Sequence, residues 1–179
     1  MSHLAHFRDY ARYSAWFNER LYDVAASLSE EERRRDLGAF FQSVHGTLNH
    51  LLLTDRLWLH RFARIEPGWS AFRGATLIEQ QGALDRELFA ELEALRRERV
   101  ETDGVIGEWM AELDADALKR PMRYANSKGE VREHPLWFGL AHFFNHQTHH
   151  RGQVTTLLSQ LGRDPGPTDF LIAYYLPKD

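Results

Sequence analysis

The sequence predicts an all-α protein, a four-helix bundle with a short β-hairpin inserted before the last helix. Two patterns indicate this fold class. Apolar residues recur at intervals of three and four along four long stretches, as they do in helices that bury one face. Before the last of these stretches, two short runs of alternating polarity flank the turn sequence NSKG, which is typical of a hairpin. Bundles of this kind commonly carry their sites on the facing sides of core helices.

The first two long helices follow from this spacing. The first is expected over residues 3–28, and the sequence SEEE after it is a helix-start signature for a second, short helical turn. The next long helix is expected over residues 42–64. Pro67 and Gly68 then break the chain, so the sequence EPGWSAFRGA is predicted to be a loop.

The second half of the chain continues the pattern. A third helix is expected over residues 77–113, with Gly104 as the point at which it could break. After the hairpin, the last helix starts behind Pro135 and runs to Leu161, where Gly162 provides the C-terminal stop. The tail sequence DFLIAYYL is apolar enough to pack back on the bundle.

Length and composition predict one globular domain over residues 1–179. The 179 residues suffice for one compact core, and neither an internal repeat nor a linker divides them. Apolar residues make up 43% of the chain and charged residues 27%, which is ordinary for a globular protein. The formal net charge of −4 lacks the basic character of nucleic-acid-binding proteins, so no nucleic-acid partner is expected.

The absence of cysteine removes several classes of site. Disulfides, thiolate metal sites and a cysteine nucleophile are excluded. The first residues lack the pattern of a signal peptide, and no apolar run approaches the ~20 residues that a membrane span requires. A cytoplasmic protein without a membrane partner is therefore expected.

Four histidines gather in the last predicted helix. At 100° per residue, His150 falls in the seam that faces the core, and His146 lies one turn earlier and about 40° around the helix. His142 and His149 lie further round and are expected to be exposed or at the rim. Two imidazoles one turn apart can bind the same cation, and a cluster of hydrogen-bonded polar groups is the alternative interpretation.

The second long helix offers further polar residues. Asp55 lies in its apolar seam, where an ionised carboxylate requires a nearby cation, arginine or histidine. His50 lies on the shoulder of that seam, so its position leaves open whether it is a third metal ligand or an ordinary surface histidine.

Several known site types are absent from the sequence. Gln147 follows His146, so the pair lacks the glutamate of the zincin motif. Neither the Glu-x-x-His pattern of di-iron bundles nor a glycine-rich phosphate loop nor a nucleophile elbow is found.

Two segments together resemble the DinB family. They are TLNHLLLTDRLWLHRF in the second long helix and LAHFFNHQTHHRGQVTTLLSQLG in the last one, followed by a proline-containing turn and an aspartate. The resemblance covers nearly the whole chain, including the hairpin. It implies a DinB/YfiT-like four-helix bundle, often a homodimer, that holds a divalent metal ion with three histidines. Carried over to this sequence, these ligands are His50, His146 and His150.

The resemblance also implies a chemistry. Characterised relatives use their metal to activate a low-molecular-weight thiol, as bacillithiol and mycothiol transferases do, and such an ion can equally activate water for hydrolysis. Three nitrogen ligands suit zinc, nickel, copper and iron alike. Zinc and nickel are the leading candidates, and iron, manganese and copper remain possible metals. We expect Asp55 and Gln153 to support the ligands and Arg151 to hold an anionic small-molecule substrate. The alternative is a bundle that binds a metal or small ligand in a stress response without turnover.

A homodimer is also suggested by the aromatic content. One small core accounts for most of the aromatic side chains, and a dimer interface could take the remainder. The residues concerned are Trp16, Phe17, Trp69, Phe72, Trp109 and the aromatic residues of the tail.

Overall fold

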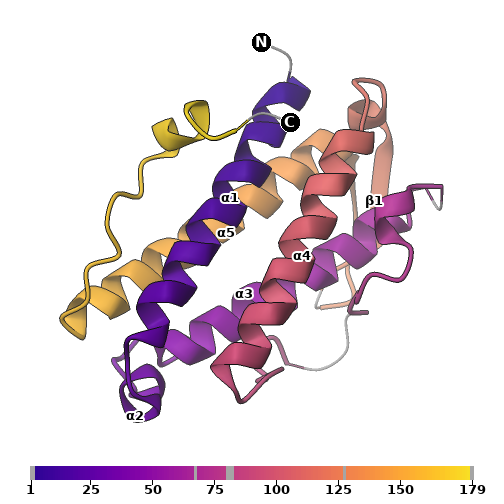
Figure 1. Cartoon of the computed structure of the whole chain (residues 1–179). Coiled ribbons are helices and arrows are strands. Elements are labelled where there is room, and N and C mark those ends of the chain that lie inside the picture. Colours follow the sequence, from indigo (N-terminus) through magenta and orange to yellow (C-terminus); the bar gives the residue numbers. More distant parts are fainter. Residues whose placement is uncertain (1–2, 67, 80–82, 127, 178–179) are drawn as a thin grey trace.

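Four long helices form the body of the molecule in the computed structural model, which describes residues 3–66, 68–79, 83–126 and 128–177. They are α1 (His3–Ala26), α3 (Val44–Ala63), α4 (Leu92–Glu112) and α5 (Leu136–Gln160). Helix α1 packs against α4 and α5, and α3 packs against the same two helices from the other side (Figure 1). The order around the bundle is therefore α1, α4, α3, α5, and the predicted fold class is confirmed.

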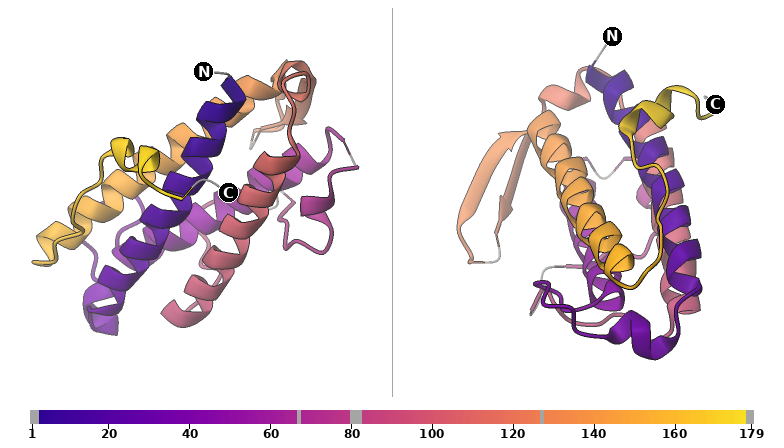
Figure 2. Two further views of the ribbon diagram at one scale, coloured as in Figure 1. Left: turned by 45° about the horizontal axis from the view of Figure 1, so that its top comes forward. Right: turned by 90° about the vertical axis from the view of Figure 1, so that its left-hand side faces the viewer.

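The shorter elements lie around this bundle. They are α2 (Glu30–Arg34), three 3₁₀ turns, η1 (Ser70–Phe72), η2 (Ala117–Lys119) and η3 (Phe170–Tyr174), and the strands β1 (Pro121–Ala125) and β2 (Val131–Pro135). Figure 2 shows the hairpin standing off the side of the bundle formed by α3 and α5, away from α1 and α4. No helix in the described part of the chain is both long enough and apolar enough to span a membrane.

The predicted helix boundaries hold where local capping decides them. Ser29 and Glu32 form a capping box at the start of α2, as the sequence SEEE indicated. At the end of α5, the N–H of Arg163 donates to the carbonyl of Leu158 and Gly162 has a φ of 72°, which is a Schellman motif. These two ends are specified by residues within five positions of one another.

The prediction of a helix over residues 77–113 is wrong in its first part. Residues 80–82 of that part lie outside the described residues. Helix α4 begins only at Leu92 and then runs unbroken through Gly104. The segment before it is bound to α3 instead: the side-chain oxygen of Asn49 accepts the N–H groups of Leu88 and Phe89, at 2.8 and 3.0 Å. Because α3 satisfies these N–H groups, the segment forms turns and bends instead of a helix.

The hairpin pairs as the alternating polarity predicted. Pro121 lies opposite Pro135 at one end of the antiparallel ladder, and Ala125 lies opposite Val131 at the other. In the turn, the side-chain oxygen of Asn126 accepts the N–H groups of Lys128 and Glu130, and Gly129 has a φ of 77°. Ser127, the remaining residue of the predicted NSKG turn, lies outside the described residues.

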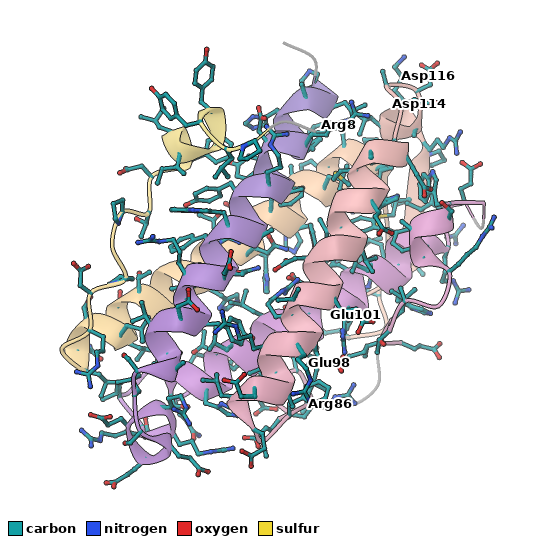
Figure 3. The ribbon with its side chains drawn as sticks, viewed as in Figure 1. Arg8, Arg86, Glu98, Glu101, Asp114 and Asp116 are labelled. Atoms are coloured by element: carbon teal, nitrogen blue, oxygen red, sulfur yellow. The ribbon has the colours of Figure 1, made fainter. Side chains whose placement is uncertain are left out.

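One arginine joins the start of α1 to the end of α4. Arg8, near the start of α1, donates through Nε to the carbonyl of Met110 at 2.9 Å and through Nη2 to that of Leu113 at 3.0 Å. Figure 3 shows Arg8 beside the end of α4, with Asp114 in the turn that follows. A cation here satisfies the open carbonyl groups of the last helical turn.

The tail returns to the bundle, as predicted. Residues of η3 lie along α1, where Phe170 stacks on Tyr10 with ring centroids 4.4 Å apart. The hydroxyl of Tyr13 donates to the carbonyl of Thr168, which holds the preceding segment against the same helix.

The interior consists of two apolar clusters with a polar layer between them. In α3, α4 and α5 one cluster occupies one half of the helix and the second cluster the other half. The buried polar residues that lie between the two clusters in these helices include Asp55, Arg56, Arg99, Thr102, Gln147 and Arg151. We call this set, together with Asp103 and with Asn18 of α1, the polar layer.

Candidate metal centre

Three imidazoles from two helices converge in the groove between α3 and α5. His50 comes from α3, and His146 and His150 come from α5. Each offers one ring nitrogen to a group in which these atoms all lie within 4.8 Å of one another. The structure thus brings together the three residues that the family resemblance implied.

The two histidines of α5 lie one helical turn apart and point to the same place. Their rings are 4.3 Å apart between centroids, and the two Nε2 atoms are separated by 3.1 Å. For comparison, two nitrogens bound to one tetrahedral zinc ion lie ~3.3 Å apart, because each Zn–N bond measures ~2.0–2.1 Å. The ring of His50 lies 4.5 Å from that of His150 and 5.4 Å from that of His146.

Hydrogen bonds at the far side of two rings fix which nitrogen carries the proton. Nδ1 of His50 lies 2.8 Å from the carbonyl oxygen of Leu84, and Nδ1 of His150 lies 2.7 Å from Oε1 of Gln153. Both oxygens can only accept, so each Nδ1 is a donor and each Nε2 keeps its lone pair. This is the arrangement in which metal-binding histidines are usually oriented. The donor set therefore suits a divalent cation.

The surroundings keep these rings neutral. Burial lowers the pKa of His50 to about 4 and that of His146 to about 3, and it also lowers the pKa of His150. The proximity of the rings adds to the effect, since protonation of one opposes protonation of the next. At neutral pH all three rings can donate electron pairs.

Phe41 covers one side of the cluster. Its ring stacks on that of His50 at 3.7 Å and meets that of His150 edge-on at 5.5 Å. The loop that carries Phe41 can approach α3 closely because residue 46 is glycine: a Cβ there would collide with the carbonyl oxygen of Phe41. Neither Phe41 nor Gly46 carries chemistry, and no sequence motif pointed to this wall.

The other side of the cluster opens into a cavity of about 420 Å³. His50 and His146 line it, together with residues of α3, α5 and the hairpin. A cavity of this size accepts a small molecule. The centre is therefore reachable from one side and closed by Phe41 on the other.

The three residues expected to support the site lie in different places. Gln153 binds Nδ1 of His150, so it touches the cluster directly. Asp55 belongs to the polar layer, where its Oδ2 accepts from Arg99 at 2.6 Å and from Nε2 of Gln147 at 3.0 Å. The buried carboxylate thus has the arginine partner that its position in the seam required.

The placement of Arg151 does not support a role in substrate binding. Its side chain is fully buried and is not among the described residues that line the cavity. The guanidinium donates to Oε1 of Gln147 at 3.3 Å and packs over the rings of Tyr13 and Phe17. Its contacts are those of a structural member of the polar layer.

The remaining histidines of α5 lie outside the cluster. His142 and His149 are both exposed, as their positions on the helix predicted. His149 approaches the amide nitrogen of Gln153 at 3.3 Å, and the ring of His142 lies 4.8 Å from that of Trp58 at the edge of the cavity.

Comparison with known proteins gives matches over nearly the whole chain. The model of the DinB family matches residues 1–177. Protein DinB of Bacillus subtilis (strain 168) is 25% identical over 172 residues, which cover 93% of this chain and 92% of that protein. No solved structure matches the chain significantly.

Proposed function

The chain belongs to the DinB family, and from this membership we propose that it is a metal-dependent enzyme with a three-histidine centre. His50, His146 and His150 would hold one divalent ion, and a small molecule would reach it through the adjoining cavity. The observation that carries the proposal is the convergence of three neutral ring nitrogens from two helices. The proposed reactions are transfer to a low-molecular-weight thiol or hydrolysis by water.

The residues of the chain have distinct parts in this proposal. When bound, a divalent ion lowers the pKa of a thiol (normally ~8.5) or of water enough for deprotonation near neutral pH. The carbonyl of Leu84 and the amide of Gln153 orient two of the imidazoles. Phe41 keeps water from the covered side of His50. Three neutral ligands leave the full charge of the ion available to the substrate.

We propose zinc or nickel as the bound metal. Imidazole nitrogen suits zinc, nickel, copper and iron, whereas manganese and magnesium prefer oxygen ligands. Each of the three residues of the group offers a ring nitrogen as its ligand atom. Metal analysis of protein purified without an affinity tag decides between the candidates.

Chelation is expected to destabilise the folded protein. A ligand present at 1,000 times its Kd stabilises the native state by ~4 kcal/mol, which corresponds to roughly 10 °C in Tm for a chain of this size. Thermal unfolding measured by circular dichroism with EDTA, and again after zinc or nickel is restored, checks this. An unchanged Tm would show that these histidines hold no ion.

Turnover is tested separately on the metal-loaded protein. Cysteine and other small thiols are offered with an electrophile such as 1-chloro-2,4-dinitrobenzene, and an activated ester is offered with water alone. Metal-dependent product formation supports the enzyme. Metal binding without turnover in any combination favours the alternative, a bundle that stores or senses a metal or small ligand.

We further propose that two copies of the chain associate. Support comes from large apolar side chains exposed near one another: Trp137 and Phe138 line a cavity beside Phe7 and Tyr10 of α1, along which η3 also lies. Because apolar surface of this kind marks interfaces, a dimeric mass is expected by light scattering at micromolar concentration. A monomeric mass there would contradict the proposal.

A further inference from the structure

The cavity beside the three histidines has basic side chains in its wall. Arg61 of α3 and Arg132 of β2 both line it, together with His134 and His142. None of its described lining residues is acidic. Such a wall attracts an anion, and the low-dielectric surroundings of a cavity strengthen that attraction.

Arg61 is held in a fixed position on this wall. Its guanidinium carbon lies 4.8 Å from the ring centroid of Trp58 and 4.5 Å from that of Tyr124, so the two aromatic rings clamp it between α3 and the hairpin. Its Nη2 also donates to the carbonyl of Ala125 at 3.4 Å. A guanidinium stacked in this way is oriented in advance, and less entropy is lost when it binds a carboxylate.

Three other arginines near the cavity and the bundle core have carboxylate partners. Arg132 pairs with Glu130 at 2.6 Å, Arg99 with Asp55 at 2.6 Å, and Arg56 with Glu98 at 2.6 Å. Arg61 is clamped between two aromatic faces. Aromatic faces leave the edge of a guanidinium, which carries the N–H groups, as the part that recognises planar anions.

Arg61 and His50 lie on one stripe of α3. Eleven residues separate them, so their Cα atoms lie ~16 Å apart along the helix axis. Helical side chains lean toward the N-terminus, which brings the guanidinium back toward His50 and leaves a gap on the order of 10 Å. The side chains along this gap include Leu57, Trp58 and Leu84, which are apolar.

We propose that the substrate is a small organic acid with an apolar, preferably aromatic, body. Its carboxylate binds Arg61, its body lies along Trp58 and Leu57, and its other end reaches the three histidines. Only the contact between the substrate and the three histidines rests on the proposed function, because binding of the carboxylate at Arg61 requires no metal. Arg61 is thus a residue that determines specificity, a role for which Arg151 is too deeply buried.

The proposal is tested with two probes of equal shape, 2-naphthoate and its uncharged amide, 2-naphthamide. Binding is measured by isothermal titration calorimetry on protein freed of metal with EDTA, so that the carboxylate cannot bind an ion. One charge-assisted bond contributes enough for 2-naphthoate to bind about tenfold more tightly than the amide. Equal affinities, or no binding of 2-naphthoate at millimolar concentration, would overturn the proposal.

Matched variants identify the residue whose charge binds the carboxylate. Arg61→Gln should reduce the ratio of the two affinities to about one, whereas Arg97→Gln, at an exposed position of α4, should leave it unchanged. Arg61→Lys keeps the charge and should retain part of the ratio, which provides a second reading if the glutamine variant folds poorly. An unchanged ratio in Arg61→Gln would assign the anion to another residue and overturn the proposal.

Metal content separates this inference from the proposed function. If the chain binds no ion but still prefers 2-naphthoate through Arg61, the anion site stands and the metal-dependent enzyme is refuted. If it binds one ion per chain but does not distinguish the two probes, the anion site alone is refuted.

Discussion

Replacing His146 with alanine is expected to abolish stable metal binding. His146 supplies the nitrogen that lies 3.1 Å from that of His150, so the variant keeps only two imidazoles, one on each helix. Loss of a group that merely orients a ligand weakens metal binding by ~10–100-fold, and loss of a ligand itself should exceed that. After dialysis against metal-free buffer, atomic emission should find one ion per chain in the parent protein and almost none in the variant.

His149→Ala provides the matched control for this experiment. His149 precedes His150 on the same helix, but its side chain is exposed and lies outside the group of three. It should retain the ion, with at most a modest loss through its contact with Gln153. Full retention of one ion per chain by His146→Ala would rule out the assignment of the ligands.

Replacing Arg99 with methionine is expected to destabilise the fold by ~3–5 kcal/mol, the usual cost of leaving buried charges without their partner. Arg99 binds Asp55 at 2.6 Å and Asp103 at 2.8 Å, and all three side chains are largely shielded from water. Burial raises the pKa of Asp55 and the charge of Arg99 opposes that rise. Without the arginine, the two carboxylates must take up protons or draw water into the bundle.

Urea denaturation followed by circular dichroism measures this loss of stability. Arg97→Met, two residues away on the exposed side of α4, should change the free energy of unfolding by no more than ~0.5 kcal/mol. Adding Asp55→Leu to Arg99→Met should restore part of the loss, since one of the two stranded charges is then removed. A loss below ~1 kcal/mol in Arg99→Met would mean that water already reaches this pair.

Helical periodicity and capping were sufficient to predict most of the fold. Both the capping box at Ser29 and the glycine stop at Gly162 act within a few residues, so the sequence carries the full signal. The segment before α4 was predicted to be helical because its own residues permit a helix. Its actual path depends on Asn49, which lies on another helix and about 40 residues earlier. Such long-range competition has no periodic signature.

Only part of the candidate site was predictable from the sequence, because the rest likewise depends on long-range contacts. The spacing of His146 and His150 places them together on any helix, whereas the inward direction of His50 came from the family resemblance. Three features depend on contacts between distant segments: the wall formed by Phe41, the carbonyl of Leu84 behind His50, and the clamp around Arg61. Arg151 and Arg61 could not be told apart by residue type, because depth alone decides which of them can meet a substrate.

The polar layer also decides how the four helices align along their axes. Asn18 binds Asp103, Arg99 joins Asp103 to Asp55, and Asp55 joins Gln147, so one chain of bonds crosses all four long helices. The apolar stripes alone would tolerate a helix shifted by one turn, ~5.4 Å, but such a shift would break the bonds by which this chain joins that helix to its neighbours. Folding therefore selects a single register, and in that register His50 already faces His146 and His150. The imidazole triad is consequently preassembled by the protein before any ion arrives.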